Sequence, residues 1–119
     1  MKILYVEDNS INRLIVLKTL ERTYPIDAVE TANEAFELAA KNDYDVYLID
    51  INLNDPDIDG FGVLDELKQK KGNDPIYIAY TNFIGTNWVK SCLEAGFDHY
   101  LSKPLDLKAF TSFVEKKSE

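Results

Sequence analysis

The chain alternates between short runs of apolar residues and longer stretches in which apolar residues recur at helical spacing. Its central run, Val46-Tyr47-Leu48-Ile49, ends on the carboxylate of Asp50 and leads into a loop rich in Asp, Asn and Gly. A continuous apolar run of this length between turn residues is typical of a strand buried on both faces. Such strands belong mainly to parallel sheets covered by helices, where ligands bind beyond the carboxyl ends of the strands. We therefore expect Asp50 to lie at the end of the sheet where ligands bind.

Two further apolar runs predict strands over residues 3–6 and 75–80, and a weaker strand over 26–30 and a short one over 97–101 are also expected. Helical spacing predicts five helices, whose apolar positions run from Ile11 to Tyr24, Ala32 to Ala39, Phe61 to Leu67, Trp88 to Leu93 and Leu107 to Val114. Strands alternating with helices imply a parallel sheet with helices on both faces. The predicted fold is α/β, a doubly wound five-stranded parallel sheet with five helices, in a single domain over residues 1–119.

Composition and charge narrow the classes of function. A hydrophobic content of 45% and a charged content of 29% are ordinary for a soluble globular domain. No apolar run approaches the roughly 20 residues that cross a bilayer, so we expect no membrane insertion. The single cysteine excludes an internal disulfide and favours the cytoplasm. The net charge of −8 argues against direct nucleic-acid binding. A first strand close behind Met1 favours a natural N-terminus.

Polar residues follow the predicted strands at the points where the strands end. Glu7 and Asp8 follow the first strand, Asp50 ends the third, Thr81 the fourth and Lys103 the fifth. The carboxyl ends of parallel strands share one edge, so these side chains should lie close together. Two carboxylates about 4–5 Å apart repel by roughly 3–4 kcal/mol at an effective dielectric constant near 20. Either a proton or a cation must therefore lie among them.

A hard divalent cation would satisfy this cluster. Mg²⁺ prefers about six oxygen ligands and usually keeps several waters beside one or two carboxylates. Asp8 and Asp50 can supply carboxylate oxygens and Asn52 a backbone carbonyl. Glu7 can hold a bound water. Three carboxylates, one divalent ion and the Lys103 ammonium sum to zero charge, so we expect Mg²⁺ as the cofactor, with Mn²⁺ as a substitute.

These residues resemble those of the response regulator receiver domain of two-component signalling, over the whole chain. The matching motifs are the acidic pair Glu7-Asp8, the phosphoacceptor Asp50, the strand-ending Thr81, the Lys103-Pro104 pair and the switch aromatic Tyr100. Val6-Glu7-Asp8-Asn9 together with Asn12 further resembles receivers attached to hybrid histidine kinases. The resemblance implies the strand order 2-1-3-4-5. The chain is expected to be either a stand-alone regulator or part of a longer protein.

The resemblance also implies a signalling switch rather than an enzyme of the usual kind. Asp50 would accept a phosphoryl group from a phosphohistidine on a sensor or hybrid histidine kinase or a histidine phosphotransfer protein. Mg²⁺ and Lys103 would bind phosphoryl oxygens, and the Thr81 hydroxyl would take a third. Tyr100 would then turn inward and change the face formed by the fourth helix, fifth strand and fifth helix.

Two stretches depart from the family pattern. The loop from Asn54 to Gly60 carries about two extra residues, and we expect the fold to tolerate them because lengthening a loop costs little. Asn82 stands where a small residue usually follows Thr81, and it should narrow access to the phosphoryl group. A cis bond is plausible at Lys103-Pro104.

Other functions remain open at this point. A pseudo-receiver would keep the fold and bind partners without being phosphorylated. A phosphatase of the haloacid dehalogenase type also forms an aspartyl phosphate with Mg²⁺, but it requires a second acid where Asn52 stands. A flavodoxin-like cofactor site would be repelled by Glu7-Asp8. We expect His99 at the surface, Cys92 buried in a helix, and Trp88 in the core or facing a partner.

Overall fold

The described residues, 1–53, 55–82 and 85–118, form a five-stranded parallel sheet with five helices in a computed structural model of the chain; the side chains of residues 116–118 are not described. The strands are β1 (Ile3–Val6), β2 (Ile26–Val29), β3 (Val46–Asp50), β4 (Ile76–Thr81) and β5 (His99–Ser102). The helices are α1 (Ser10–Leu20), α2 (Ala32–Lys41), α3 (Gly60–Lys71), α4 (Thr86–Ala95) and α5 (Leu107–Ser118). The strand order β2-β1-β3-β4-β5 confirms the predicted fold.

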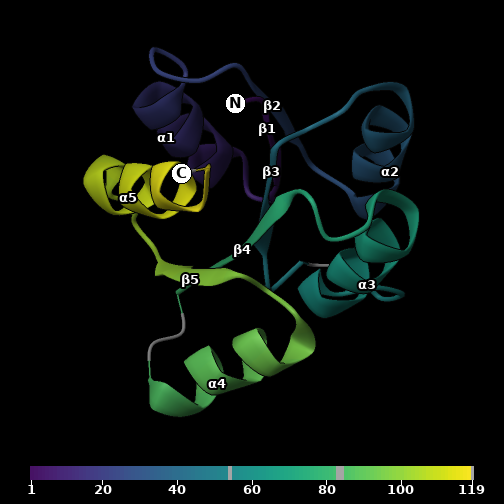
Figure 1. Ribbon diagram of the computed structural model, residues 1–119. Helices are drawn as coiled ribbons and strands as arrows, with labels where there is room; N and C mark the ends of the chain where they lie inside the picture. The colour runs from purple at the N-terminus through teal and green to yellow at the C-terminus, as the bar shows by residue number, and fades with distance from the viewer. Residues whose placement is uncertain (54, 83–84, 119) are drawn as a thin grey trace.

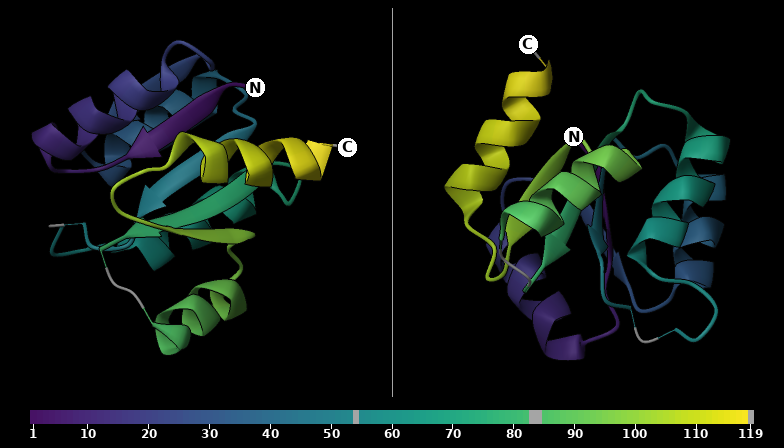
Figure 2. Two further views of the ribbon diagram at one scale, coloured as in Figure 1. Left: turned by 90° about the vertical axis from the view of Figure 1, so that its left-hand side faces the viewer. Right: turned by 90° about the horizontal axis from the view of Figure 1, so that it is seen from below.

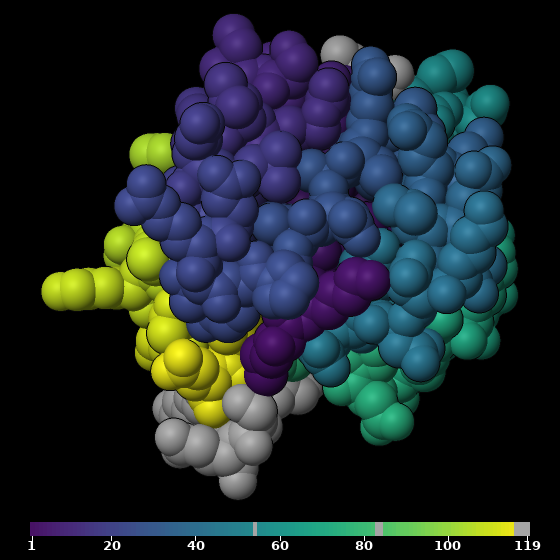
Figure 3. Space-filling view, turned by 90° about the horizontal axis from the view of Figure 1, so that it is seen from above, coloured from purple at the N-terminus to yellow at the C-terminus, as the bar shows by residue number. Residues whose placement is uncertain are grey.

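The helices cover both faces of the sheet, as Figures 1 and 2 show. On one face α1 and α5 pack over a cluster that includes Val16, Leu20 and Phe110. On the other face α2, α3 and α4 contribute Ala35, Leu64 and Cys92 to a second cluster, among other residues. Seen from above, the amino-terminal third, purple to blue, forms most of the visible surface, with yellow α5 at its margin (Figure 3).

The central strand has the burial that its apolar run predicts. All five residues of β3 are buried, with Val46 and Leu48 facing one cluster and Tyr47 and Ile49 the other. β3 pairs with β1 on one side and with β4 on the other. Asp50 therefore ends a fully buried strand that is paired on both sides. In the described ranges no helix is long and apolar enough to cross a membrane.

The helix ends follow the capping chemistry of the sequence. The Asn9 side chain accepts a hydrogen bond from the Asn12 N–H and caps α1, as expected. Gly96 ends α4 at a φ of 117°, a left-handed conformation that glycine adopts without strain. The predicted α1 boundary was wrong, because the helix ends at Leu20 rather than Tyr24. The Leu20 carbonyl accepts from both Thr23 and Tyr24, and the resulting turn places the Tyr24 ring against Phe110.

The bounds of three predicted strands also shift. β2 stops at Val29, one residue early, and β4 covers residues 76–81 instead of 75–80. β5 begins at His99 rather than Phe97 and ends at Ser102 rather than Leu101. Asp98 explains that delay: its side chain accepts from the Tyr77 N–H at 2.9 Å and its own N–H donates to the Tyr77 carbonyl at 2.7 Å. Phe97 is buried nonetheless.

Candidate functional site

Three acidic side chains meet at the carboxyl ends of β1 and β3. These strands pair in register from Ile3 opposite Val46 to Val6 opposite Ile49, so the residues that follow them are neighbours. One carboxylate oxygen each of Glu7, Asp8 and Asp50 lies within 4.8 Å of the others. Glu7 and Asp50 are only 1% and 3% exposed, whereas Asp8 is half-buried. The structure thus brings together the acidic set that the sequence predicts.

Lys103 reaches into this cluster from the end of β5. Its Nζ lies 2.6 Å from Glu7 Oε1 and 3.4 Å from Asp50 Oδ1, and its side chain is only 9% exposed. The Lys103 N–H donates to the Thr81 carbonyl at 2.8 Å, which ties the residue to the end of β4. The Lys103-Pro104 peptide bond is cis, as anticipated. One ammonium therefore contacts two buried carboxyl groups.

The shortage of positive charge perturbs both buried acids. Burial and the adjacent Glu7 raise the pKa of Asp50 to about 7. Burial opposes ionisation of Glu7 as well, but hydrogen bonds from Asp50 and Lys103 outweigh it and lower the pKa of Glu7. Both pKa shifts have the same origin. Two buried carboxyl groups this close together ionise fully only when a further cation balances their charge.

Sequence reasoning missed three residues that hold Glu7 and Lys103 in place. The Tyr5 hydroxyl donates to Glu7 Oε1 at 3.0 Å, and Arg13 Nη1 donates to the Glu7 carbonyl at 2.8 Å. The Lys103 Nζ lies 5.4 Å from the centre of the Tyr80 ring. Tyr5 could have been found from strand periodicity, because residues two apart share a face of the sheet. Arg13 and Tyr80 carry no comparable signal.

Gly60, at the start of α3, packs directly on the backbone of the phosphoacceptor candidate. Its N–H donates to the Ile51 carbonyl at 3.2 Å. A Cβ atom at Gly60 would meet the Asp50 carbonyl oxygen at 2.5 Å and Ile51 Cα at 2.7 Å, closer than real Cβ contacts come. Because only glycine fits here, Gly60 allows the start of α3 to pack directly against the end of β3.

The remaining predicted site residues lie around this centre. Asn52 is exposed, and its N–H donates to Asp50 Oδ1 at 3.3 Å. Thr81 is buried at the end of β4, next to β3. Asn82 follows it and is exposed; residues 83 and 84 lie outside the described part of the chain. Tyr100 is half-buried against the α2, α3 and α4 cluster, and its enclosed hydroxyl has no hydrogen-bond partner among the described residues.

The predictions for three further residues, Cys92, Trp88 and His99, have different outcomes. Cys92 is buried in α4, as predicted. Trp88 is 37% exposed, so it lies at the surface rather than in the core. His99 differs from its expected surface position, because it is half-buried and its ring stacks on Phe113 with centroids 4.4 Å apart.

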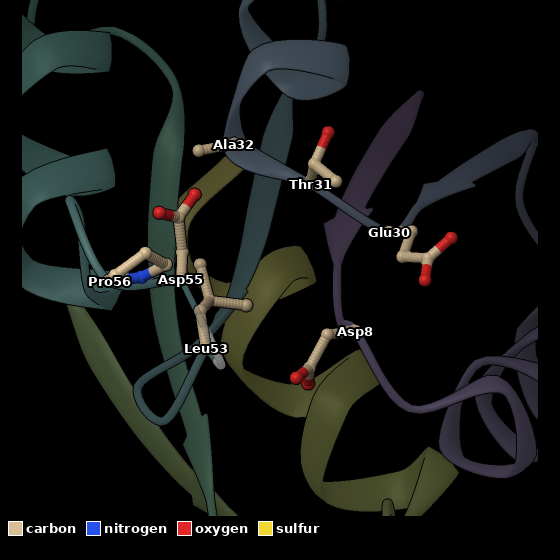
Figure 4. Close-up of a pocket in the computed structure, with 7 residues that line it drawn as sticks. All are labelled: Asp8, Glu30, Thr31, Ala32, Leu53, Asp55 and Pro56. Atoms are coloured by element: carbon tan, nitrogen blue, oxygen red, sulfur yellow. The ribbon is translucent and has the colours of Figure 1, made fainter.

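A pocket of about 520 Å³ opens beside the acidic cluster, on the Asp8 side (Figure 4). Glu30, Thr31 and Ala32 line it from the turn between β2 and α2. Leu53, Asp55 and Pro56 line it from the loop after β3. The long loop therefore forms one wall of the approach to Asp8, which is the outermost of the three acids.

The chemistry of the donors fits a hard divalent cation. Carboxylate oxygens are the ligands that Mg²⁺ and Mn²⁺ accept, and the three acids lie close enough to share one ion. When all three acids are ionised, Glu7, Asp8 and Asp50 carry three negative charges against one positive charge on Lys103, and a doubly positive ion balances the difference.

Nearly the whole length of this chain is similar in sequence to parts of known proteins. The family model of the response regulator receiver domain matches residues 3–115. The chain is 30% identical to the aerobic respiration control sensor protein ArcB of Escherichia coli, over 98% of the chain but only 15% of that protein. It is 31% identical to the osmosensing histidine protein kinase SLN1 of Saccharomyces cerevisiae, over 88% of the chain and 9% of that protein.

The fold matches solved structures as well. The receiver domain of the Francisella response regulator 1452 superimposes with a TM-score of 0.80 at 27% identity, covering 99% of this chain and 98% of the other. Sequence motifs, strand order and these similarities agree. The chain belongs to the response regulator receiver domain family of two-component signalling.

Proposed function

We propose that the chain is a phosphoacceptor switch in which Asp50 takes a phosphoryl group from a phosphohistidine. The observation that carries this proposal is the geometry of Asp50. Its carboxyl group is buried at the C-terminal end of the central strand, and the Lys103 ammonium lies 3.4 Å from its Oδ1. Two more acids within 4.8 Å complete a site suited to a cation and a phosphoryl group.

The transfer itself needs a nucleophile and charge stabilisation. An Asp50 carboxylate oxygen forms the new P–O bond while the P–N bond of the donor phosphohistidine breaks. The electron pair of that bond leaves with the imidazole nitrogen, which takes up a proton. Lys103 balances charge on the phosphoryl oxygens as a point charge. Hydrolysis of the acyl phosphate returns Asp50 and inorganic phosphate, so the domain acts on itself and turns over no separate substrate.

Asp8 and Asp50 would hold Mg²⁺ through carboxylate oxygens, Asn52 through its backbone carbonyl, and Glu7 through a bound water. The ion supplies charge neutralisation for the incoming phosphoryl group. Mn²⁺ fits the same oxygen donors.

The readout of phosphorylation would be the α4-β5-α5 face. The Thr81 hydroxyl takes a phosphoryl oxygen, and Tyr100 is held inward. In the structure the Tyr100 side chain already packs against the α2, α3 and α4 cluster with its hydroxyl enclosed, so phosphorylation would stabilise this inward position rather than create it. One local charge change would thus bias a two-state surface.

The donor would be a sensor or hybrid histidine kinase or a histidine phosphotransfer protein. The names of ArcB and SLN1, a sensor protein and a histidine protein kinase, support this class of partner. A cytoplasmic location fits a kinase partner that uses ATP. The chain spans only 15% and 9% of the length of these two relatives, so their sensing and output are not assigned to it.

A mass measurement tests the proposal. The protein is incubated with Mg²⁺ and acetyl phosphate, and we expect one added phosphoryl group by intact mass. Asp50→Asn should take none, whereas Asp55→Asn, an acid of the neighbouring loop, should still be modified. Absence of the adduct with acetyl phosphate and with a phosphorylated kinase, together with no Mg²⁺ binding, would favour the pseudo-receiver. Rapid turnover of unrelated phosphate esters would instead favour a phosphatase.

A further inference from the structure

Tyr5 places a phenol in the middle of a buried apolar strand. Its side chain is 0% exposed, although a Phe ring would fill the same space without a polar atom. A buried hydroxyl is costly unless it makes a hydrogen bond. The Tyr5 hydroxyl makes that bond with Glu7, to Oε1 at 3.0 Å. The Tyr5 hydroxyl therefore hydrogen-bonds to a residue of the functional site.

The contact is directed at one oxygen. Glu7 Oε1 also accepts from Lys103 Nζ at 2.6 Å, so two donors engage the same carboxylate atom. Oε2 is less engaged, and among the hydrogen bonds assigned to that oxygen in the described ranges it accepts one from the Asn9 N–H at 3.5 Å. With Oε1 occupied, Oε2 is the oxygen of Glu7 left for a cation or its bound water.

The Tyr5 ring is held rigidly enough to aim this bond. It meets the Tyr80 ring edge-on, with centroids 5.8 Å apart and an interplanar angle of 66°. Tyr80 in turn lies beneath the Lys103 ammonium. Tyr5 and Tyr80 lie on β1 and β4, on either side of β3, so the donor, the acid and the ammonium are fixed by paired strands.

We propose that Tyr5 is a positioning residue that fixes the Glu7 carboxylate through Oε1 and so presents Oε2 to the metal. This inference rests on the proposed function, since it concerns how the same site holds Mg²⁺. Hydrogen-bond partners of ligating carboxylates orient them, and their loss typically costs 10–100-fold in metal affinity.

The test is calorimetric titration of the protein with Mg²⁺ in the absence of any phosphodonor. We expect Tyr5→Phe to weaken Mg²⁺ binding about tenfold while thermal unfolding stays cooperative. Tyr47→Phe is the matched control, because Tyr47 is equally buried on the next strand and its hydroxyl has no partner among the described residues. That control should bind Mg²⁺ as the wild type does.

A double-mutant cycle separates positioning from general loosening of the site. If Tyr5 acts through Glu7, Tyr5→Phe should have no further effect on Mg²⁺ affinity in the Glu7→Ala background. Wild-type affinity in Tyr5→Phe, or an undiminished loss in the Glu7→Ala background, would overturn the inference. The proposed function fails separately, if the wild type itself neither binds Mg²⁺ nor gains a phosphoryl group from acetyl phosphate.

Discussion

Glu7 and Asp50 share a single ammonium, and this imbalance governs the chemistry of the site at the scale of single residues. Both carboxyl groups are buried, and buried charges are stable only when they are paired. Lys103 pairs with both, at 2.6 Å and 3.4 Å, which leaves excess negative charge once Asp8 is counted. We expect the same imbalance to attract a cation, whose positive charge would keep Asp50 ionised as the nucleophile.

Replacing Lys103 should affect metal binding and phosphorylation in opposite directions. Lys103→Ala removes a positive charge beside the acids, so Mg²⁺ affinity should rise at least about tenfold. It also removes the group that balances phosphoryl charge, so phosphorylation by acetyl phosphate should slow at least about 100-fold. Calorimetry and intact mass measure the two effects. Lys70→Ala, which removes an exposed ion pair with Glu66 and a contact with the Phe36 ring, should change neither. A parallel loss of both properties would contradict this role.

Asn82 should slow the resetting of the switch. It follows buried Thr81 and occupies the position where receivers usually carry a small residue. A smaller side chain should admit water more easily, so Asn82→Ala should release phosphate from the phosphorylated protein several-fold faster. The decay of the phosphorylated mass after removal of the donor gives the rate. Equal rates for Asn82→Ala and the wild type would show that Asn82 does not narrow the site.

At the scale of elements, the loop after β3 is held by contacts within it and at both ends. The Asp57 N–H donates to Asp55 Oδ1 at 2.9 Å, which closes a local turn. Its two ends are anchored, because Leu53 and Ile58 pack on the core and Asp59 caps α3 through the Gly62 N–H. The five-stranded fold is thus formed with this longer loop in place.

Gly60 is the inner anchor of this loop, and a matched pair of variants tests it. Gly60→Ala would drive Cβ into the backbone of Asp50 and Ile51, and should cost about 1–3 kcal/mol in the free energy of unfolding. At Gly62 the added Cβ would meet the Ile58 side chain, which can shift, and helix propensity favours Ala by about 1 kcal/mol. Denaturant unfolding measures both. Equal destabilisation would argue against a backbone clash at Gly60.

At the scale of the whole molecule, the site joins strands that are far apart in the chain. Glu7 and Lys103 are 96 residues apart in sequence and form a hydrogen bond at the C-terminal ends of the strands. Asp50 lies between them on β3, which pairs with both β1 and β4. A ligand held by these residues must therefore stabilise the native sheet as a unit, because the unfolded chain cannot assemble the site.

Mg²⁺ should consequently raise global stability. At a hundred times its dissociation constant, a ligand that binds only the native state adds about 2.7 kcal/mol to the free energy of unfolding. Thermal unfolding with and without Mg²⁺ measures this as a rise in Tm. Asp8→Asn should abolish most of the rise, because it removes the outermost carboxylate. A rise that survives in Asp8→Asn would place the binding of Mg²⁺ elsewhere.

Much of the architecture was predictable because it follows from local patterns. Continuous apolar runs predicted β1, β3 and β4, weaker patterns predicted β2 and β5, and capping residues such as Asn9 and Gly96 marked helix ends correctly. The errors fall where tertiary contacts override local preference. Tyr24 leaves the helical pattern to pack on Phe110, and Asp98 delays β5 by bonding to Tyr77.

The sequence by itself determined that acids and a lysine stand at strand ends, since strand and turn preferences are encoded within a few residues. Only the tertiary structure decided which of these groups touch. The 2.6 Å contact of Lys103 with Glu7, the Tyr5 hydroxyl on the same oxygen and the packing of Gly60 on Asp50 depend on strand register and loop path. Such contacts join residues distant in the chain, so no local pattern specifies their distances.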